Sequence, residues 1–243
     1  MSKTPGKLDS IGIIPAKGHS ERIPRKNMTL LAGKPLLQYT IEAALACEVL
    51  DLVMVSTDDP QIGAFARKLG AEVPFLRDAR LASDDATMAD VMIDAVEWYE
   101  RQRRKTFDKL CMLLPSSPLR TAADIVAAKR LLTGHPDADS VLSVTRCLYP
   151  PGWALHLAKD GTVEPTWPQY LTKKRQDLPD WCYENGAVFW ARMASFRRIR
   201  SQYGGVQIPY FMPPERGLDV DDPQELAYAE YLLERQRMGI AGH

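Results

Sequence analysis

Short runs of apolar residues alternate along this chain with segments whose apolar residues recur at helical spacing. The runs predict buried strands, which start at residue 11 and lie at 52–56, 109–114, 140–145, 187–191 and 208–211. The other segments predict helices that begin at Pro35, before Ile62, after Thr87, after Thr121 and after Asp222. Strands that alternate with amphipathic helices are typical of a mostly parallel sheet with helices on both faces.

Several of these helices carry local start signals. A small polar residue followed three positions later by an acidic residue has the spacing of a capping box. Such pairs stand at Thr87 and Asp90, at Thr121 and Asp124, and at Asp222 and Glu225. The helix that begins at Pro35 is expected to reach Cys47. Its buried side is predicted to consist of Leu36, Leu37, Ile41, Ala44 and Leu45.

The alternation stops between Tyr149 and Glu184. This segment is rich in proline and in aromatic residues, among them Trp153, Trp167 and Trp181. It is too apolar for a disordered linker, so we interpret it as an excursion from the sheet that packs on another surface. At 243 residues, without an internal repeat, the chain is expected to form a single domain over residues 1–243.

The composition excludes some classes of function. Lysine and arginine number 31, as do aspartate and glutamate, so no excess of positive charge is present to hold a nucleic acid. No apolar run approaches the ~20 residues of a membrane-spanning helix. Residues 1–10 are polar and lack the apolar core of a signal peptide. The four cysteines lie far apart, a pattern typical of a reduced, cytoplasmic protein.

The strand that starts at residue 11 opens into a loop of small and cationic residues. Glycine lets backbone N–H groups approach phosphate oxygens, and cations neutralise their charge, so the loop is a candidate anion site. It has neither the Gly-x-x-x-x-Gly-Lys-Ser/Thr nor the Gly-x-Gly-x-x-Gly pattern. The alternative is a solvated basic turn. The residues concerned are Lys17, Gly18, Ser20, Arg22, Arg25 and Lys26.

Three polar loops follow predicted strands, at 16–27, 57–59 and 115–120. In an open parallel sheet, ligands gather beyond the carboxyl ends of the strands. The three loops are therefore expected to converge on a single nucleotide site.

Two carboxylates near the end of the chain are candidates for a metal site. Asp219 and Asp221 alternate at the period of a strand, which would turn both to one face. Neighbouring carboxylates repel unless a cation joins them, and oxygen-only ligands suit Mg²⁺. The alternative is structural, because Asp221 and Asp222 precede the last helix and favour its dipole. The spacing alone leaves both interpretations open.

Taken in their order and spacing, seven motifs of the chain resemble those of the acylneuraminate cytidylyltransferases, which activate sialic acids and related nonulosonic acids with CTP. The resemblance covers residues 11–235. The motifs are Ile-Pro-Ala-Lys-Gly-His-Ser-Glu-Arg-Ile-Pro-Arg-Lys-Asn at 14–27, Gly-Lys-Pro-Leu at 33–36, Val-Ser-Thr-Asp-Asp at 55–59, Pro-Ser-Ser-Pro-Leu-Arg at 115–120, Arg-Gln-Asp at 175–177, Tyr-Glu-Asn-Gly at 183–186 and Asp-Val-Asp at 219–221.

This resemblance implies a Rossmann-like nucleotidyltransferase fold in which residues 149–184 form a dimerisation arm that reaches toward the partner's site. It implies that the anomeric hydroxyl of a nonulosonic acid attacks the α-phosphate of CTP and that pyrophosphate leaves. The substrates would be CTP and a nine-carbon keto-sugar acid, the cofactor Mg²⁺, and the partner a second copy of the chain.

The resemblance also implies roles for individual residues. Lys17, Lys26 and Asp221 would be catalytic, and Asp219 and Asp221 would hold Mg²⁺. Arginine suits the carboxylate of a sugar acid because it binds in a bidentate fork. Nucleotide contacts are implied for Ala16, Lys17, Gly18, Ser20, Arg22, Lys26, Asn27, Arg77 and Thr87. Sugar-acid contacts are implied for Arg120, Arg175, Gln176, Tyr183, Asn185 and Gly186.

Four residues depart from the family pattern. Lys17 stands where arginine is commoner, His19 replaces a glycine, Glu21 replaces a lysine, and Leu114 replaces a glutamine. The loss of that glutamine bears on the identity of the sugar more than on the reaction. Two alternatives are a 3-deoxy-octulosonate cytidylyltransferase, against which the motifs at 25–27 and 183–186 argue, and a catalytically silent nucleotide-sugar binding protein.

Overall fold

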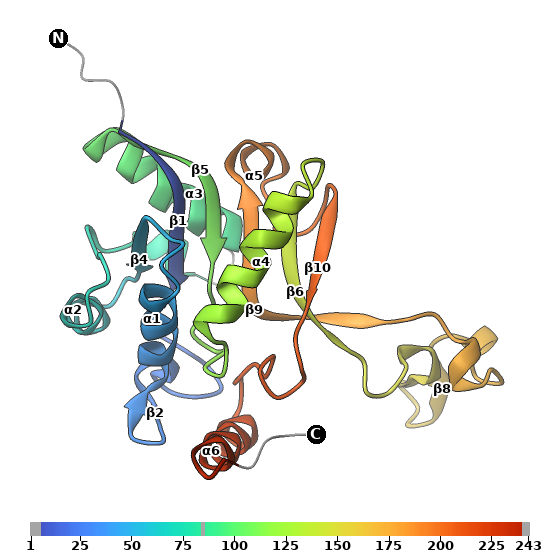
Figure 1. Ribbon diagram of the computed structural model, residues 1–243. Helices are drawn as coiled ribbons and strands as arrows, with labels where there is room; N and C mark the ends of the chain where they lie inside the picture. Colours follow the sequence, from blue (N-terminus) through green and yellow to red (C-terminus); the bar gives the residue numbers. More distant parts are fainter. Residues whose placement is uncertain (1–5, 84–85, 240–243) are drawn as a thin grey trace.

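A six-stranded sheet runs through the centre of the protein, in the order β10-β6-β9-β5-β1-β4 (Figure 1). The computed structural model describes residues 6–83 and 86–239, so part of the polar start at 1–10 lies outside the described residues. The strands are β1 (Gly6–Pro15), β4 (Leu52–Ser56), β5 (Lys105–Met112), β6 (Ser140–Arg146), β9 (Cys182–Arg192) and β10 (Gln207–Phe211).

The sheet is mostly parallel, as the sequence predicts. β1 is parallel to β4 and β5, and β10 is parallel to β6. β9 runs antiparallel to both of its neighbours, β5 and β6. A parallel neighbour needs a connection that crosses back over the sheet. The excursion after β6 instead returns the chain at the end where it left, so β9 enters the sheet in the opposite direction.

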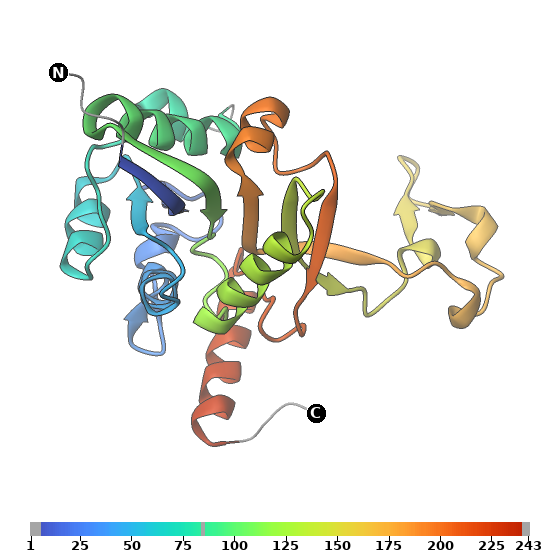
Figure 2. The same ribbon diagram turned by 45° about the horizontal axis from the view of Figure 1, so that its top comes forward.

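Helices cover both faces of the sheet (Figure 2). Alternate residues of a strand point to opposite faces. Val53 and Val55 therefore pack with one set of helices, and Leu52 and Met54 with another. The first set is α1 (Leu36–Ala46), α2 (Pro60–Lys68) and α4 (Ala122–Gly134). The second is α3 (Met88–Trp98) and α5 (Met193–Ile199).

The last helix, α6 (Pro223–Arg237), packs against a small hairpin and not against the sheet. The hairpin consists of β2 (Leu30–Leu31) and β3 (Lys34–Pro35). Its two turn residues, Ala32 and Gly33, both have positive φ, at 47° and 85°, as a two-residue hairpin turn requires. The short helical turns are η1 (Lys26–Met28), η2 (Ala79–Ala82), η3 (Tyr99–Arg103), η4 (Pro151–Trp153), η5 (Pro168–Tyr170) and η6 (Arg175–Asp177).

The start signals of the helices are confirmed. Thr121 with Asp124 forms a capping box at α4, and Asp222 with Glu225 forms one at α6. Thr87 accepts a hydrogen bond from the backbone of Asp90 at the start of α3. One burial prediction is wrong, because Leu45 lies at the edge of the buried stripe of α1 and is 40% exposed.

An arm extends from the body between β6 and β9, at the predicted excursion (Figures 1 and 2). It contains the hairpin of β7 (Leu155–Leu157) and β8 (Val163–Pro165). Gly152 lies under Trp181, which meets Tyr170 edge to face. The arm joins the body at a β-bulge, where the pairing of β9 with β6 shifts register between Leu142 and Val144. A bulge bends its strand, and here β9 turns from the sheet into the arm.

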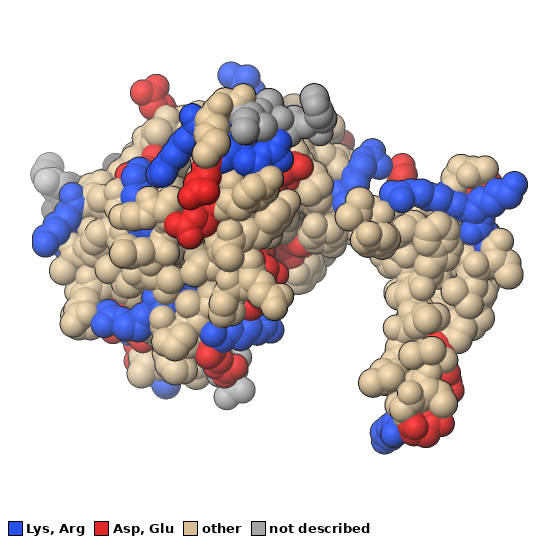
Figure 3. Space-filling model, turned by 90° about the horizontal axis from the view of Figure 1, so that it is seen from below, with Lys and Arg blue, Asp and Glu red and all other residues tan. Residues whose placement is uncertain are grey.

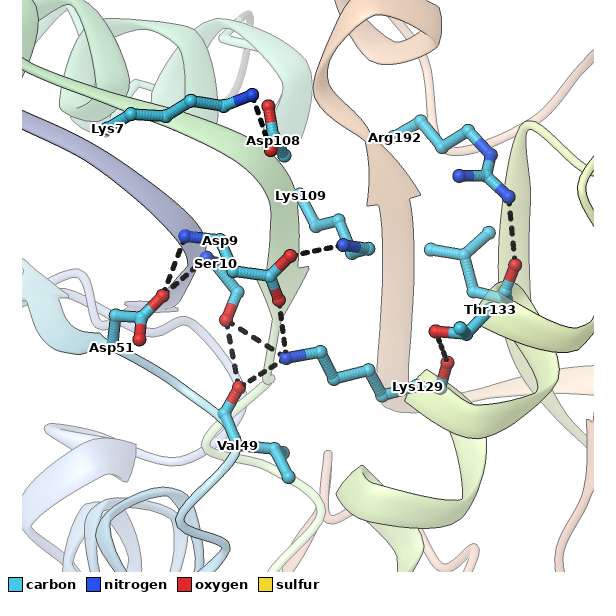
Figure 4. Close-up of polar contacts among 11 residues, drawn as sticks. Lys7, Asp9, Ser10, Val49, Asp51, Asp108, Lys109, Lys129, Thr133 and Arg192 are labelled. Carbon is cyan, nitrogen blue, oxygen red and sulfur yellow. Dashed lines mark hydrogen bonds and ion pairs between the residues drawn. The ribbon is translucent and has the colours of Figure 1, made fainter.

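A cluster of ion pairs joins β1, β5 and α4 (Figure 4). Asp9 pairs with Lys109 and, at 2.7 Å, with Lys129. The Lys129 ammonium also donates to the backbone oxygen of Val49 at 2.7 Å. The Asp51 carboxylate accepts from the backbone N–H of Asp9 at 2.8 Å. These charges are paired within the scaffold.

None of the helices in the described ranges combines the length and apolar character needed to cross a membrane.

Candidate active site

A cavity of about 610 Å³ opens at the carboxyl ends of β1 and β5. Its walls come from the loop after β1, from the turn after β5 and from the segment before α3. The predicted convergence of loops 16–27 and 115–120 is therefore confirmed. Residues 57–59 do not line the cavity but support the first loop. The lining residues are Pro15, Lys17, His19, Ser20, Glu21, Arg22, Lys26, Asn27, Arg77, Leu81, Ala82, Ser83, Ala86, Met88, Leu114, Pro115, Ser116 and Asp221.

The loop after β1 is held by its neighbours at several backbone groups. The N–H of Ala16 donates to the carbonyl of Ser56 at 2.9 Å, which continues the pairing of β1 with β4. The N–H of Gly18 donates to the Asp58 carboxylate at 2.9 Å. A Cβ atom at Gly18 would lie 2.9 Å from the Cβ of Asp59, so only glycine allows this approach. The side chain of Asn27 donates to the Lys17 carbonyl at 2.8 Å and closes the loop.

Two cations of this loop meet a carboxylate from the far end of the chain. The Lys26 ammonium lies 2.7 Å from Asp221, and the Arg22 guanidinium lies 3.2 Å from the other oxygen of the same carboxylate. The hydrogen bond from Lys26 holds the pKa of Asp221 below its usual value. The cavity therefore has a cationic wall that also carries the Asp221 carboxylate, and this carboxylate is ionised at neutral pH.

Asp219 lies beside this ion pair, and its carboxylate is less accessible to solvent than that of Asp221. Its Oδ1 atom is buried and has no hydrogen-bond partner among the described residues. Burial raises the pKa of Asp219; a hydrogen bond from Ser116 opposes this shift, and the charge of Asp221 adds to it. The two residues stand in an irregular segment and not in a strand, but both carboxylates lie close enough to repel. An unpaired buried oxygen beside a second carboxylate is a donor set that a hard cation would satisfy.

The alternative role for Asp219 and Asp221, that of stabilising the start of α6, is filled by Asp222. Asp222 is the N-cap, and its carboxylate accepts from the backbone of Gln224 and Glu225 at 2.8 Å in each case. The Glu225 carboxylate returns the contact and also accepts from the backbone of Asp221. The side chain of Asp221 is thereby left to the cavity.

Arg77 lines the opposite part of the cavity. It is only 5% exposed, and its guanidinium lies 3.6 Å from the carboxylate of Asp58. Burial lowers its pKa, and Asp58 opposes that shift. The alternative of an ordinary surface arginine does not hold. Thr87 does not line the cavity, although Ala86 and Met88 on either side of it do; its side chain caps α3.

Three of the predicted sugar-binding residues form a buried layer beneath the cavity. Arg120 donates to the carbonyls of Leu114 and Ala187 at 3.2 and 2.6 Å and to the Thr40 hydroxyl at 2.6 Å. Asn185 accepts from the Ser143 hydroxyl at 2.6 Å and donates to Thr145 at 3.0 Å. Gly186 has φ +68°, and a Cβ there would lie 2.7 Å from Leu114. None of the three lines the cavity.

The other three predicted sugar-binding residues lie on or near the arm. Arg175 donates to the Leu148 carbonyl at 3.0 Å and borders a separate hollow of about 140 Å³ at the base of the arm. Gln176 and Tyr183 are exposed. None of these lines the large cavity of its own chain. The structure thus divides the predicted sugar site between a buried layer and the arm.

Sequence patterns did not indicate one wall of the cavity. Residues 81–83, 86 and 88 line it, but no polar or charged motif marks them. Ser116 belongs to the motif at 115–120, but the sequence does not indicate its contact with the segment that carries the aspartates. Its carbonyl accepts a hydrogen bond from the backbone N–H of Val220 at 2.7 Å. All four departures from the family pattern, Lys17, His19, Glu21 and Leu114, lie on the cavity wall.

Comparison with solved structures shows the class of fold. A CMP:2-keto-3-deoxy-manno-octonic acid synthetase complexed with CTP matches with a TM-score of 0.67 over 94% of this chain and 100% of that chain, at 17% identity. A 4-diphosphocytidyl-2C-methyl-D-erythritol synthase from Anaerococcus prevotii matches with a TM-score of 0.60 over 93% and 99%, at 9% identity. The fold is that of the nucleotidyltransferases.

Comparison of sequences identifies the family. The cytidylyltransferase family profile matches residues 11–103. A CMP-N,N'-diacetyllegionaminic acid synthase of Legionella pneumophila is 33% identical over 92% of this chain and 96% of its own length. A pseudaminic acid cytidylyltransferase of Campylobacter jejuni is 30% identical over 93% and 96%. The chain belongs to the family of these nonulosonic acid cytidylyltransferases. The resemblance of its seven motifs to the acylneuraminate cytidylyltransferases is thereby confirmed. An N-acylneuraminate cytidylyltransferase of Escherichia coli is 32% identical, and the chain spans 51% of its length.

Gly217→Ala should destabilise the protein, because the segment that carries the aspartates lies directly on the buried layer. A Cβ at Gly217 would lie 2.5 Å from the Asn185 amide and 2.6 Å from the Thr145 hydroxyl, which are hydrogen-bonded to each other. We expect a loss of about 1–3 kcal/mol in the free energy of unfolding. Gly134→Ala, where a Cβ meets nothing within 4 Å, is the matched control. Equal denaturant midpoints for the two variants would contradict the close packing.

Proposed function

We propose that this chain transfers the cytidylyl group of CTP to a sialic-acid-like nonulosonic acid and releases pyrophosphate. The observation that carries the proposal is the full-length similarity to nonulosonic acid cytidylyltransferases, at 33% identity over 92% of this chain, in a protein whose main cavity has a cationic wall. The four cysteines form no disulfide, in agreement with a reaction in the cytoplasm, where we place it.

The loop after β1 would hold the phosphates of CTP. Lys17, Arg22 and Lys26 all reach the cavity, and cations on the phosphate oxygens would stabilise the charge that develops on the leaving pyrophosphate. Asp221 pairs with two of these cations, Arg22 and Lys26. Binding of a triphosphate would therefore require Lys26 and Arg22 to share their charge between Asp221 and the phosphate oxygens.

Asp219 and Asp221 are the residues that would hold Mg²⁺. The unpaired buried oxygen of Asp219 supports this assignment, as does the oxygen-only chemistry of the pair. No group of three or more potential metal ligands occurs in the described part of the chain. Water and phosphate oxygens would supply the remaining contacts, the arrangement that Mg²⁺ commonly adopts. When bound, the ion would polarise the phosphate oxygens and orient the α-phosphate for attack.

Arg77 would define the far end of the nucleotide site. Its guanidinium is fixed by burial and by Asp58, which also binds the N–H of Gly18. One carboxylate thus sets the distance between the loop and Arg77, as a site for one nucleotide requires. Thr87 would act through its position at the start of α3, between two residues that line the cavity.

The sugar acid would occupy the end of the cavity near Leu114. Leucine here offers apolar surface where the family commonly presents an amide, so the bound sugar would carry an apolar group, such as a methyl, at this place. Arg120, Asn185 and Gly186 would act from beneath, by holding the turn that carries Leu114. The octulosonate alternative has support from the fold alone, because its structural counterpart is only 17% identical.

Arg175, Gln176 and Tyr183 would act in a dimer, through the arm of a second copy. The arm exposes many large apolar side chains, and Tyr149 and Leu157 are 80% and 75% exposed. Figure 3 shows that the arm stands apart from the body and that uncharged residues make up most of its visible surface. An apolar surface of this kind is characteristic of a protein–protein contact. A symmetric dimer would cover it.

The direct test is pyrophosphate release from CTP and Mg²⁺ with a panel of nine-carbon keto acids and the eight-carbon octulosonate. We expect release with at least one nonulosonic acid and none with octulosonate. Release with octulosonate alone would establish the first alternative. CTP binding without release for any acid would establish the silent binding protein, for which Glu21 on the cavity wall is the one structural argument.

The arm predicts a dimer in solution. Light scattering at micromolar concentration should give twice the mass of one chain. Leu157→Glu should shift the equilibrium toward the monomer, because it places a charge in the apolar surface of the arm. Leu30→Glu is the matched control, since Leu30 is 62% exposed on the hairpin near α6. A parent protein that is monomeric would remove the arm from any role in assembly.

Lys26→Ala should lower turnover by about 10²–10³-fold, the usual effect of removing a cation or donor that stabilises transition-state charge. Folding should survive, because the side chain belongs to a loop. Lys34→Ala is the control, as Lys34 pairs with Glu42 on the opposite side of the hairpin. Steady-state rates and thermal melts would be compared. Turnover equal to that of the parent would take Lys26 out of the mechanism.

Asp221→Asn should separate a metal ligand from a structural residue. Turnover should fall by at least about 100-fold, since a lost ligand charge removes several kcal/mol of transition-state stabilisation. CTP binding without metal should stay constant or improve, because a carboxylate repels a triphosphate. Asp222→Asn, which keeps a good N-cap, should retain turnover. A lower melting temperature with normal turnover in Asp221→Asn would refute the metal site.

A further inference from the structure

The segment that carries both aspartates has no regular secondary structure. Between the end of β10 and the start of α6, residues 212–222 form neither helix nor strand. The backbone is fixed near the two ends, where Met212 donates to Val144 at 2.8 Å and Val220 donates to Ser116 at 2.7 Å. Ligands of a metal ion must be held in place by the groups around them. The middle of the segment therefore needs a fixed point of its own.

That point is an ion pair with the first turn of α4. The Arg216 guanidinium donates to Oδ1 of Asp124 at 3.0 Å. Asp124 is 1% exposed, and its other oxygen accepts from the backbone and hydroxyl of Thr121 at 2.8 and 2.7 Å. Tyr210 on β10 donates to Oδ1 at 2.8 Å. Burial raises the pKa of Asp124, but these hydrogen bonds outweigh it and keep the carboxylate ionised.

This carboxylate joins two parts of the candidate site. Through Thr121 it fixes the start of α4, directly after the 115–120 turn that borders the cavity. Through Arg216 it fixes the segment three residues before Asp219. The segment has no room to move inward at Gly217, where even an added Cβ would lie 2.5 Å from the Asn185 amide and 2.6 Å from the Thr145 hydroxyl. It cannot lift away without leaving a buried carboxylate short of its cation, which is costly.

We infer that Asp124 and Arg216 form a positioning pair, which holds Asp219 and Asp221 at the place where they bind the divalent metal. The inference rests on the proposed function, because it takes these aspartates as the metal ligands. Neither member of the pair would touch the metal or the substrates. Their effect would pass through the backbone from Arg216 to Asp219, and the geometry between the aspartates and Ser116 would depend on it.

The test compares two variants that each remove one donor from the same oxygen of Asp124. Arg216→Gln removes the donor on the aspartate segment, and Tyr210→Phe removes the donor on β10. Binding of Mn²⁺ is measured by electron paramagnetic resonance in the presence of a non-hydrolysable CTP analogue. Arg216→Gln should weaken Mn²⁺ binding by about 10–100-fold, the usual effect of removing a group that supports metal ligands. Tyr210→Phe should lower the melting temperature and leave Mn²⁺ affinity at the parental value.

Further measurements separate positioning from simple destabilisation. Arg216→Lys keeps the charge and should recover part of the Mn²⁺ affinity. Binding of the CTP analogue without metal should be the same in all variants. Parental Mn²⁺ affinity in Arg216→Gln with a lowered melting temperature would overturn the inference, as would equal losses of affinity in Arg216→Gln and Tyr210→Phe. If Arg216→Gln does not fold, parental affinity in Asp124→Asn would overturn it.

A different set of results would show that the proposed function itself is wrong. A parent protein that binds the CTP analogue but no Mn²⁺, and that releases no pyrophosphate with any sugar acid, would remove the metal site itself. An active, Mn²⁺-binding parent with an unaffected Arg216→Gln variant would remove only the positioning role.

Discussion

Two neighbouring carboxylates, Asp219 and Asp221, bring negative charge to the cavity, and two cations of the loop after β1 pair with the second of them. Asp219 is largely withdrawn from water and Asp221 is not, so the pair places negative charge where solvation is poor. Lys26 and Arg22 compensate for the charge of Asp221. Both cations come from the loop after β1, nearly two hundred positions earlier in the chain. The loop after the first strand consequently meets the segment before the last helix through the same charges that would act on the substrate.

The periodicity of the sequence located the six strands of the sheet and five of the helices, but it missed α5 and the start of β1 at Gly6, and it did not orient β9. Residues 187–191 have the apolar pattern of a buried strand, and that pattern is the same for a parallel and an antiparallel strand. Direction depends on where the preceding excursion returns the chain, and nothing local in the sequence records this. Leu45 shows the same limit on a smaller scale, because helical spacing alone does not say how wide the buried stripe will be.

The site was predictable where residue chemistry is distinctive and less so where it is ambiguous. The basic loop and the aspartates were found from their charges, and the structure brings Lys26 and Asp221 to 2.7 Å. Arg120 has the same donors for a substrate carboxylate as for backbone carbonyls, and in this structure its contacts are to Leu114, Ala187 and Thr40. The wall formed by residues 81–83, 86 and 88 belongs to none of the motifs found in the sequence. It borders the cavity only because α3 begins beside the loop after β1.

The bulge in β9 links the shape of the cavity floor to the direction of the arm. Gly186 stands at this bulge with φ +68°, a conformation that other residues adopt with difficulty, and Leu114 presses against it from the cavity side. The same bend sends the strand out of the sheet toward the surface on which a second copy would dock. In the proposed dimer, a change at this glycine would therefore alter the angle at which two subunits meet as well as the contour that the proposed sugar encounters. One backbone torsion would then couple the fit of the substrate to the quaternary geometry.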